Sequence, residues 1–265
     1  MKSAIIGAGN IGMALAEGLV KSGTCTPGDI TLTRRSLHSF SQQEKGFAVT
    51  TSNPEAVATA DVVFLCVLPQ QLNAVLDEIK DSVNAERQLL ISVVTGVHTN
   101  DIRDRLQSDV RIIRAMPNTA LKVNASMTCI SAANATEADI QMVQNLFNTM
   151  GTSIIINEEM MSAATALCAC GIAFFLRSIR AAAQGGVEIG FHAHDAIIIA
   201  AQTALGAAQL LLTNKTHPEE EIDKVTSPKG CTIAGLNEME HQGLSSAMIK
   251  GIKLSANIAN ELYKR

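Results

Sequence analysis

A glycine-rich turn near the N-terminus constrains the fold of this chain more than any other feature. Residues 3–6 are typical of a short buried strand, and they lead directly into Gly7-Ala8-Gly9-Asn10-Ile11-Gly12, after which a helical pattern runs over 11–21. In a βαβ unit the first glycine allows a tight turn, the second admits a pyrophosphate and the third lets helix and strand pack closely. The helix N-terminus adds amides that attract phosphate. The motif therefore predicts a dinucleotide site at Gly7, Gly9, Asn10, Ile11 and Gly12, and an ordinary structural turn is the weaker alternative.

Strand and helix patterns alternate through the first half of the chain. Short β-branched runs predict strands at residues 3–6, 30–33, 47–50, 62–67, 88–93 and 111–115, with two more at 127–131 and 153–156. Helices are predicted at 11–21, near Gln42, and at 54–60, 70–83, 99–106 and 136–149. This alternation indicates an α/β fold with a doubly wound, mainly parallel sheet of the Rossmann type.

The end of the second predicted strand indicates which dinucleotide binds. An NAD site would place a carboxylate there, whereas this chain reads Thr31-Leu32-Thr33-Arg34-Arg35-Ser36. A guanidinium can bind a 2′-phosphate through two hydrogen bonds. We therefore predict that Arg34 and Arg35 contact NADP(H), and the alternative for Arg35 is a solvated loop charge.

The second half of the chain has a different pattern. After Glu158 the strand signals stop, and helices follow one another with predicted breaks at Gly185-Gly186, 216–218, 227–230 and Gln242-Gly243. Two of these helices, near 163–176 and 197–212, are apolar on nearly every side and must be packed against other helices all round. The second half of the chain has too few other helices to bury them. The sequence thus predicts an NADP-binding Rossmann domain over 1–157 and an all-helical dimerisation and substrate domain over 158–265, with assembly into a homodimer or a higher homo-oligomer.

Composition excludes several classes of protein. A net charge of −4 and an aromatic content of 3% argue against nucleic-acid binding. The six cysteines are scattered through apolar runs without a disulfide framework, and residues 1–6 lack the long apolar region of a signal peptide. We expect a cytoplasmic protein that binds neither nucleic acid nor membrane. No metal site is expected, because side chains at i and i+2 on a helix, such as Cys168 and Cys170, point in different directions.

Several longer motifs resemble those of the pyrroline-5-carboxylate reductase family. The resemblance runs along essentially the whole chain and is most specific near the C-terminus. Besides the glycine loop, it rests on Ser52-Asn53-Pro54-Glu55, Cys66-Val67-Leu68-Pro69-Gln70, Arg114-Ala115-Met116-Pro117-Asn118-Thr119, residues 200–207 and Val225-Thr226-Ser227-Pro228-Lys229-Gly230-Cys231-Thr232-Ile233-Ala234-Gly235-Leu236.

The resemblance implies a function and a set of site residues. The implied reaction is the NADPH-dependent reduction of the C=N bond of the cyclic imine 1-pyrroline-5-carboxylate to give L-proline. It is an oxidoreductase reaction and the last step of proline biosynthesis. The implied cofactor contacts are Asn53, Val67, Leu68, Pro69, Gln70, Ala115, Pro117 and Asn118. The implied substrate contacts are Ser227, Gly230, Cys231 and Thr232.

The chemistry itself requires few catalytic groups. The cofactor supplies hydride to the imine carbon while the nitrogen takes a proton, so the protein has to position the reactants and hydrogen-bond the nitrogen. The Thr232 hydroxyl is our candidate catalytic group, and the free amides of the helix that starts after Pro228 suit the substrate carboxylate. N-capping of an ordinary helix is the alternative role for Ser227 and Thr232.

The chain departs from the family pattern at three places. Where the family usually has Ser-Gly-Ser-Gly-Pro-Ala-Tyr, this chain has Cys168-Ala169-Cys170-Gly171-Ile172-Ala173-Phe174. Where the family usually has Ser-Pro-Gly-Gly-Thr-Thr, residues 227–232 read Ser-Pro-Lys-Gly-Cys-Thr. The lysine that usually precedes the proline of the loop after the fourth strand is Leu68 here. These departures motivate a second hypothesis, a catalytically impaired or differently specific dinucleotide-binding paralogue of the same fold. A β-hydroxyacid dehydrogenase is disfavoured, because the lysine that such an enzyme needs early in its second domain is absent between Lys122 and Lys215.

Overall fold

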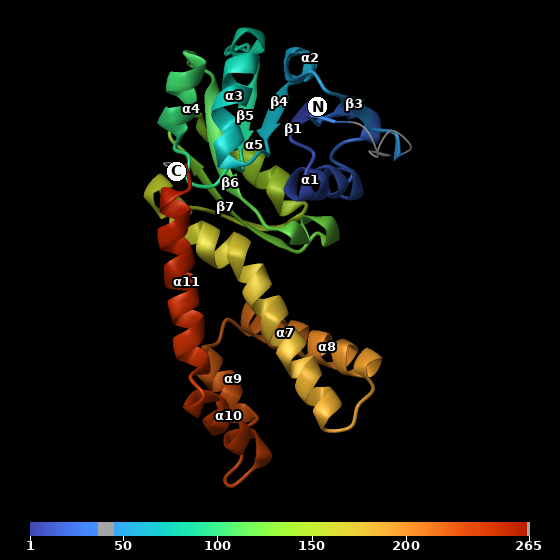
Figure 1. Cartoon of the computed structure of the whole chain (residues 1–265), viewed down its shortest axis with the longest axis vertical. Coiled ribbons are helices and arrows are strands. Elements are labelled where there is room, and N and C mark those ends of the chain that lie inside the picture. The colour runs from blue at the N-terminus through green and yellow to red at the C-terminus, as the bar shows by residue number, and fades with distance from the viewer. Residues whose placement is uncertain (37–44, 264–265) are drawn as a thin grey trace. The chain divides into compact units, whose positions relative to one another are not determined.

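The computed structural model of the chain describes residues 1–36 and 45–263 (Figure 1). These residues form two compact units, one made of residues 1–36, 45–170 and 254–263 and the other of Gly171–Lys253. The helix predicted near Gln42 lies outside the described residues.

Within the described residues, the first unit is built on an eight-stranded sheet with the order β3-β2-β1-β4-β5-β6-β7-β8. The strands are β1 (Ser3–Ile6), β2 (Ile30–Thr33), β3 (Ala48–Thr50), β4 (Val62–Leu65), β5 (Leu89–Ser92), β6 (Arg111–Met116), β7 (Ser126–Ala132) and β8 (Gly151–Ile155). Neighbours are parallel except at the β6–β7 pair. The predicted doubly wound, mainly parallel sheet is confirmed.

The central strands are continuous apolar runs because both of their faces are covered. All four residues of β1 and of β4 are buried. The helices of this unit are α1 (Asn10–Lys21), α2 (Asn53–Thr59), α3 (Pro69–Ile79), α4 (Thr99–Leu106) and α5 (Glu137–Asn148), with short 3-10 turns at Pro27–Asp29, Lys80–Ser82, Thr119–Val123 and Glu158–Met160. The single helix predicted over 70–83 ends at Ile79 and continues as a 3-10 turn.

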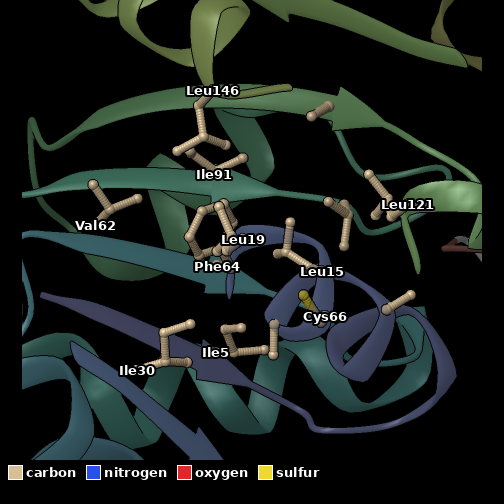
Figure 2. Packing of buried hydrophobic residues seen from close by; sticks show 14 of the residues in the cluster. Ile5, Leu15, Leu19, Ile30, Val62, Phe64, Cys66, Ile91, Leu121 and Leu146 are labelled. Atoms are coloured by element: carbon tan, nitrogen blue, oxygen red, sulfur yellow. The ribbon is translucent and has the colours of Figure 1, made fainter. Parts of the chain in front are cut away.

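Two apolar cores lie on opposite faces of the sheet. On one face α1 and α5 pack against inward side chains of the strands, and Figure 2 shows Leu15 and Leu19 of α1 beside Phe64 and Ile91. On the other face α2, α3 and α4 cover the alternate side chains of the same strands. This alternation of burial places the strand ends, and the loops that follow them, at a fixed edge of the sheet.

The second unit is entirely helical in the part of the chain that the structure describes. Its helices are α7 (Gly171–Glu188), α8 (Ala193–Asn214), α9 (Pro218–Lys224), α10 (Cys231–His241) and the first ten residues of α11 (Leu244–Glu261). The break predicted at Gly185-Gly186 is wrong, because α7 continues through both glycines. Gly186 allows close packing on Ala196 of α8, and the chain turns instead at Gly190, which has a φ of +110°.

The division between compact units differs from the predicted boundary at residue 157. The segment α6 (Met161–Ala164) and the π-helical turn Thr165–Cys170 belong to the first unit, because Met161 and Cys168 pack against Met116 and Cys129. The end of the chain also belongs there, since Tyr263 Oη donates a hydrogen bond of 2.8 Å to Asn73 Oδ1. Residue 157 therefore marks where the strands stop and not where the compact units divide.

The two longest apolar helices leave most of their surface uncovered within one chain. The segments Glu158–Glu188 and Ala193–Asn214 are long and apolar enough to cross a membrane by length and composition, and only 6% of the apolar stretch of the second is buried. Large apolar side chains such as Phe175 and Leu212 are exposed. Exposure on this scale is typical of surfaces that bind another protein or a membrane.

Candidate functional site

A cavity of about 1080 Å³ lies in the first unit at the carboxyl ends of β1, β2 and β4. Ligands of open α/β sheets bind at this edge, at the point where the strand order changes direction, which here lies between β1 and β4. The cavity is lined by Ile6, Gly7, Ala8, Gly9, Asn10, Ile11, Thr33, Arg34, Arg35, Ser36, Thr51, Asn53, Cys66, Val67, Leu68, Pro69, Gln70, Gln71, Ala74, Val75, Glu78, Val93 and Thr95. Eleven of the fifteen predicted cofactor residues are in this lining.

Each glycine of the N-terminal loop has a separate geometric reason. Gly7 has a φ of +97°, and a Cβ there would lie 2.7 Å from the carbonyl oxygen of Cys66. A Cβ on Gly9 would have open space around it, on the side of the cavity. A Cβ on Gly12 would collide with the carbonyl oxygen of Gly7. The three roles predicted from the sequence, a tight turn, room for a pyrophosphate and close packing, thus match the geometry.

The glycine loop is fixed to the end of β2. The amide of Gly7 donates to Thr33 Oγ1 at 3.2 Å, and the amide of Ala8 donates to the carbonyl of Thr33 at 2.9 Å. Helix α1 then begins without a side-chain cap and without an acidic residue in its first turn. Its N-terminal amides and the positive end of its dipole therefore face the cavity without a competing anion from that turn.

The arginines lie at the β2 end of the same cavity. Arg34, Arg35 and Ser36 line it, and the amide of Arg34 donates to the carbonyl of Thr50 at 3.3 Å. No carboxylate follows β2 in the described part of this loop. This end of the cavity has the composition expected for a 2′-phosphate.

Four predicted cofactor residues lie outside the cavity lining. Gly12 closes the turn beneath Gly7, and Ala115 is fully buried in the core on β6. Pro117 is buried, and Asn118 accepts a hydrogen bond from the amide of Ala120 while its Nδ2 donates to the carbonyl of Cys168 at 3.2 Å. The structure gives Gly12 and Asn118 structural roles, and a cofactor contact by the Ala115–Asn118 loop stays a prediction.

Several lining residues were not predicted from the sequence. On α3 these are Gln71, Ala74, Val75 and Glu78, which follow the i, i+3, i+4, i+7 spacing of one helix face. Once the loop of residues 67–70 is placed at the cofactor, this spacing identifies the face of the following helix. The remaining unpredicted lining residues are Ile6, Ala8, Thr33, Ser36, Thr51, Cys66, Val93 and Thr95.

The predicted substrate residues form a group of their own in the second unit. Helix α10 begins at Cys231 with Gly230 as its N-cap, so Thr232 is its second residue and lies nearer the helix start than expected. The amide of Gly230 donates to the carbonyl of Ser227 at 3.0 Å. No side chain caps α10, and its first turn has no acidic residue. The start of α10 therefore offers amides and a hydroxyl to an anionic ligand.

Comparison with known proteins gives the family. Residues 158–262 match the domain family described as pyrroline-5-carboxylate reductase dimerisation, and residues 2–96 match the family described as NADP oxidoreductase coenzyme F420-dependent. Pyrroline-5-carboxylate reductase 2 of Dictyostelium discoideum is 48% identical over 96% of this chain and 90% of its own length. The chain belongs to the pyrroline-5-carboxylate reductase family.

Other members of the family agree with this assignment. Pyrroline-5-carboxylate reductase 1 of Dictyostelium discoideum is 53% identical over 98% of this chain, and the chain spans about half of its length (49%). The crystal structure of Plasmodium falciparum pyrroline carboxylate reductase with NADP bound has the same fold, with a TM-score of 0.91 at 23% identity over 99% of this chain and 98% of that one.

The structure places the departures from the pyrroline-5-carboxylate reductase pattern. Leu68 lines the cavity and is 63% exposed, so its side chain has no buried packing role. Cys168 lies in the π-helical turn with Sγ 3.2 Å from the carbonyl oxygen of Met127 and 4.0 Å from Cys129 Sγ. The contact with Cys129, together with burial, raises the pKa of the Cys168 thiol. Cys168 is thus a packed neutral thiol on the sheet side, as predicted for a buried cysteine.

Proposed function

We propose that this chain catalyses the NADPH-dependent reduction of 1-pyrroline-5-carboxylate to L-proline. The observation that supports the proposal most is the cavity of the first unit, which is lined both by a phosphate-type glycine loop and by the arginines at the end of β2. The curated relatives that match the chain bear the name of this activity. By the same proposal the protein is cytoplasmic, works apart from membranes and nucleic acids, and assembles as a homo-oligomer.

The residues of the cavity fit a dinucleotide. The open space over Gly9 and the uncapped start of α1 suit a pyrophosphate, and Arg34 and Arg35 suit a 2′-phosphate. Bound NADPH supplies the hydride that the imine carbon accepts. Val67 and Leu68, in the short loop between β4 and α3, bring apolar surface to the cavity.

The substrate side of the reaction falls to the start of α10. The backbone amides there hold the carboxylate of the imino acid, and the Thr232 hydroxyl donates a hydrogen bond to the ring nitrogen. This hydrogen bond stabilises the negative charge that develops on the nitrogen as the imine carbon accepts hydride. The nitrogen then takes its proton from water. The protein thereby orients two reactants and needs no strongly shifted acid or base.

The test is a measurement of NADPH oxidation with pyrroline-5-carboxylate and with a six-membered cyclic imine. We expect turnover of the five-membered substrate and a loss of about 10²–10³ in kcat for Thr232→Val, which keeps the shape and removes the donor. Dinucleotide affinity should stay the same in this variant. Cys231→Thr is the control and should remain within a few fold of the parent. Dinucleotide binding without turnover of either imine would instead support the impaired paralogue, and full activity of Thr232→Val would reduce Thr232 to a helix residue.

A further inference from the structure

The nucleotide cavity contains a carboxylate that the sequence motifs do not predict. Glu78, on the last turn of α3, lines the cavity together with the two arginines. Asn53 Nδ2 donates a hydrogen bond of 2.8 Å to Glu78 Oε2. In an NAD-type site the acidic residue follows the second strand, so a carboxylate that reaches the cavity from α3 is a separate feature of this chain.

A short series of contacts places Glu78 at the β2 end of the cavity. The amide of Arg34 donates to the carbonyl of Thr50, at the end of β3. Asn53 follows Thr50 by three residues at the start of α2, and its side chain reaches Glu78. Arg34, Asn53 and Glu78 all line the same cavity. The carboxylate therefore borders the part of the cavity that the arginines make suitable for the ribose phosphate.

NADPH and NADH differ only by the 2′-phosphate, so a charged group at this end of the cavity acts differently on the two cofactors. A phosphate monoester carries nearly two negative charges at neutral pH and is repelled by a carboxylate. A ribose hydroxyl, by contrast, can donate a hydrogen bond to a carboxylate. We infer that Glu78 is a cofactor-selectivity residue, which weakens the NADPH preference set by Arg34 and Arg35 and so allows the enzyme to use NADH as well.

The hydrogen bond to Asn53 adds a second effect in the same direction. A carboxylate only accepts hydrogen bonds, so Glu78 engages an N–H of Asn53 that would otherwise be available to a phosphate oxygen. Glu78→Gln removes the charge and leaves an oxygen that can still accept from Asn53. Glu78→Ala removes both the charge and the acceptor. The two variants separate electrostatic repulsion from the competition for Asn53.

The inference rests on the proposed function, and the experiment keeps the two apart. We would titrate the full-length protein with NADP⁺ and NAD⁺ by calorimetry at low salt and in 0.5 M salt, and assay turnover in parallel. Glu78→Gln should tighten NADP⁺ binding by about three- to tenfold and change NAD⁺ binding by less than about twofold. The gain should shrink in 0.5 M salt, because screening weakens interactions between exposed charges. Glu78→Ala should tighten NADP⁺ binding at least as much.

Glu86→Gln is the matched control, since Glu86 is exposed and does not line the cavity. It should leave both affinities unchanged. An unchanged ratio of NADP⁺ to NAD⁺ affinity in both Glu78 variants would overturn the inference while leaving the proposed reaction standing. The expected shift in a protein that turns over neither imine would support the selectivity role and overturn the reaction. A parent protein that binds neither dinucleotide would overturn both.

Discussion

Replacing Glu158 by Gln should destabilise the first unit far more than its half-buried position near the end of the sheet suggests. Glu158 Oε1 accepts hydrogen bonds from the Thr99 amide at 2.7 Å, from Thr99 Oγ1 at 2.8 Å and from Arg114 at 3.2 Å. Arg114 is only 3% exposed, and its Nε has no hydrogen-bond partner among the described residues. The carboxylate of Glu158 therefore forms an ion pair with a buried cation, and it joins α4, β6 and the segment that leads to α6.

The size of the effect follows from what the variant leaves behind. Glutamine keeps one oxygen for Thr99 but presents no negative charge to the buried guanidinium. A hydrogen bond to a charged group contributes about 1.5–3 kcal/mol, and a buried ion with its partner removed costs about 3–5 kcal/mol. Because Glu158 is partly solvated, we expect a loss of roughly 2–4 kcal/mol in the free energy of unfolding.

The pH dependence has a definite sign. Burial by itself raises the pKa of Glu158, but the hydrogen bonds from Thr99 and Arg114 outweigh burial and hold this pKa below its ordinary value of 4.5. A group with a depressed pKa in the folded state binds fewer protons than in the unfolded chain, so the stability it contributes is present at neutral pH. That contribution is lost as the pH falls below 4.5 and through the folded pKa. The difference between parent and variant should shrink over the same range.

The assay is urea unfolding at one fixed protein concentration, since assembly makes apparent stability depend on concentration. Glu159→Gln is the control, because Glu159 is the exposed neighbour and the chemical change is the same. Parent and control should unfold at similar urea concentrations near neutral pH, and Glu158→Gln well below them. Equal midpoints for the two variants would refute the reasoning, and so would a difference that stays constant as the pH is lowered to about 3.

Two further outcomes are expected. Changing both Arg34 and Arg35 to Ala should weaken NADPH binding by about 1.5–3 kcal/mol for each charge-assisted hydrogen bond removed and barely change NADH binding, as measured by fluorescence titration; equal reductions in affinity for both cofactors would show that neither arginine reads the phosphate. Light scattering of the full chain should give at least a dimer, because α7 and α8 expose apolar side chains such as Phe175 and Leu212; a monomer over micromolar concentrations would contradict this account of the exposed helices.

The sheet was predictable because each buried strand is a short apolar run. A strand such as Val62–Leu65 is buried on both faces, so its composition differs sharply from that of the helices around it. The glycine loop was predictable for a similar reason, since the backbone at position 7 has a positive φ and position 12 has no room for a Cβ. In both cases a local steric or burial requirement restricts which residue types can occupy a position, so the requirement is visible in the sequence pattern.

Features that depend on contacts between distant segments were not predictable in the same way. Gly185 and Gly186 indicate a break, yet Gly186 serves helix packing on Ala196, which the sequence alone does not reveal. Asn118 belongs to a motif of the family loop, but its side chain hydrogen-bonds the carbonyl of Cys168, far along the chain. The carboxylate of Glu78 reaches the nucleotide cavity only because α3 runs along its wall. The roles of Gly186 and Asn118 come from tertiary neighbours that no local pattern encodes. The spacing on α3 marks one helix face, but it identifies that face as a cavity wall only after residues 67–70 have been placed at the cofactor.

The substrate loop shows which departures from a family pattern a site can accept. Lys229 stands where the resemblance expects the first of two glycines, and it has a φ of +60°. A non-glycine residue there is strained by roughly 1–2 kcal/mol, but the lysine side chain can extend away from the turn. Gly230 is different, because a Cβ at this position would collide with Ser227 Oγ and change the start of α10. At position 229, where only the backbone angle favours glycine, the chain has a lysine. At position 230, where the neighbouring Ser227 side chain leaves no room for a Cβ, the glycine is kept. The amides beside Thr232 therefore retain the geometry on which the proposed substrate contact depends.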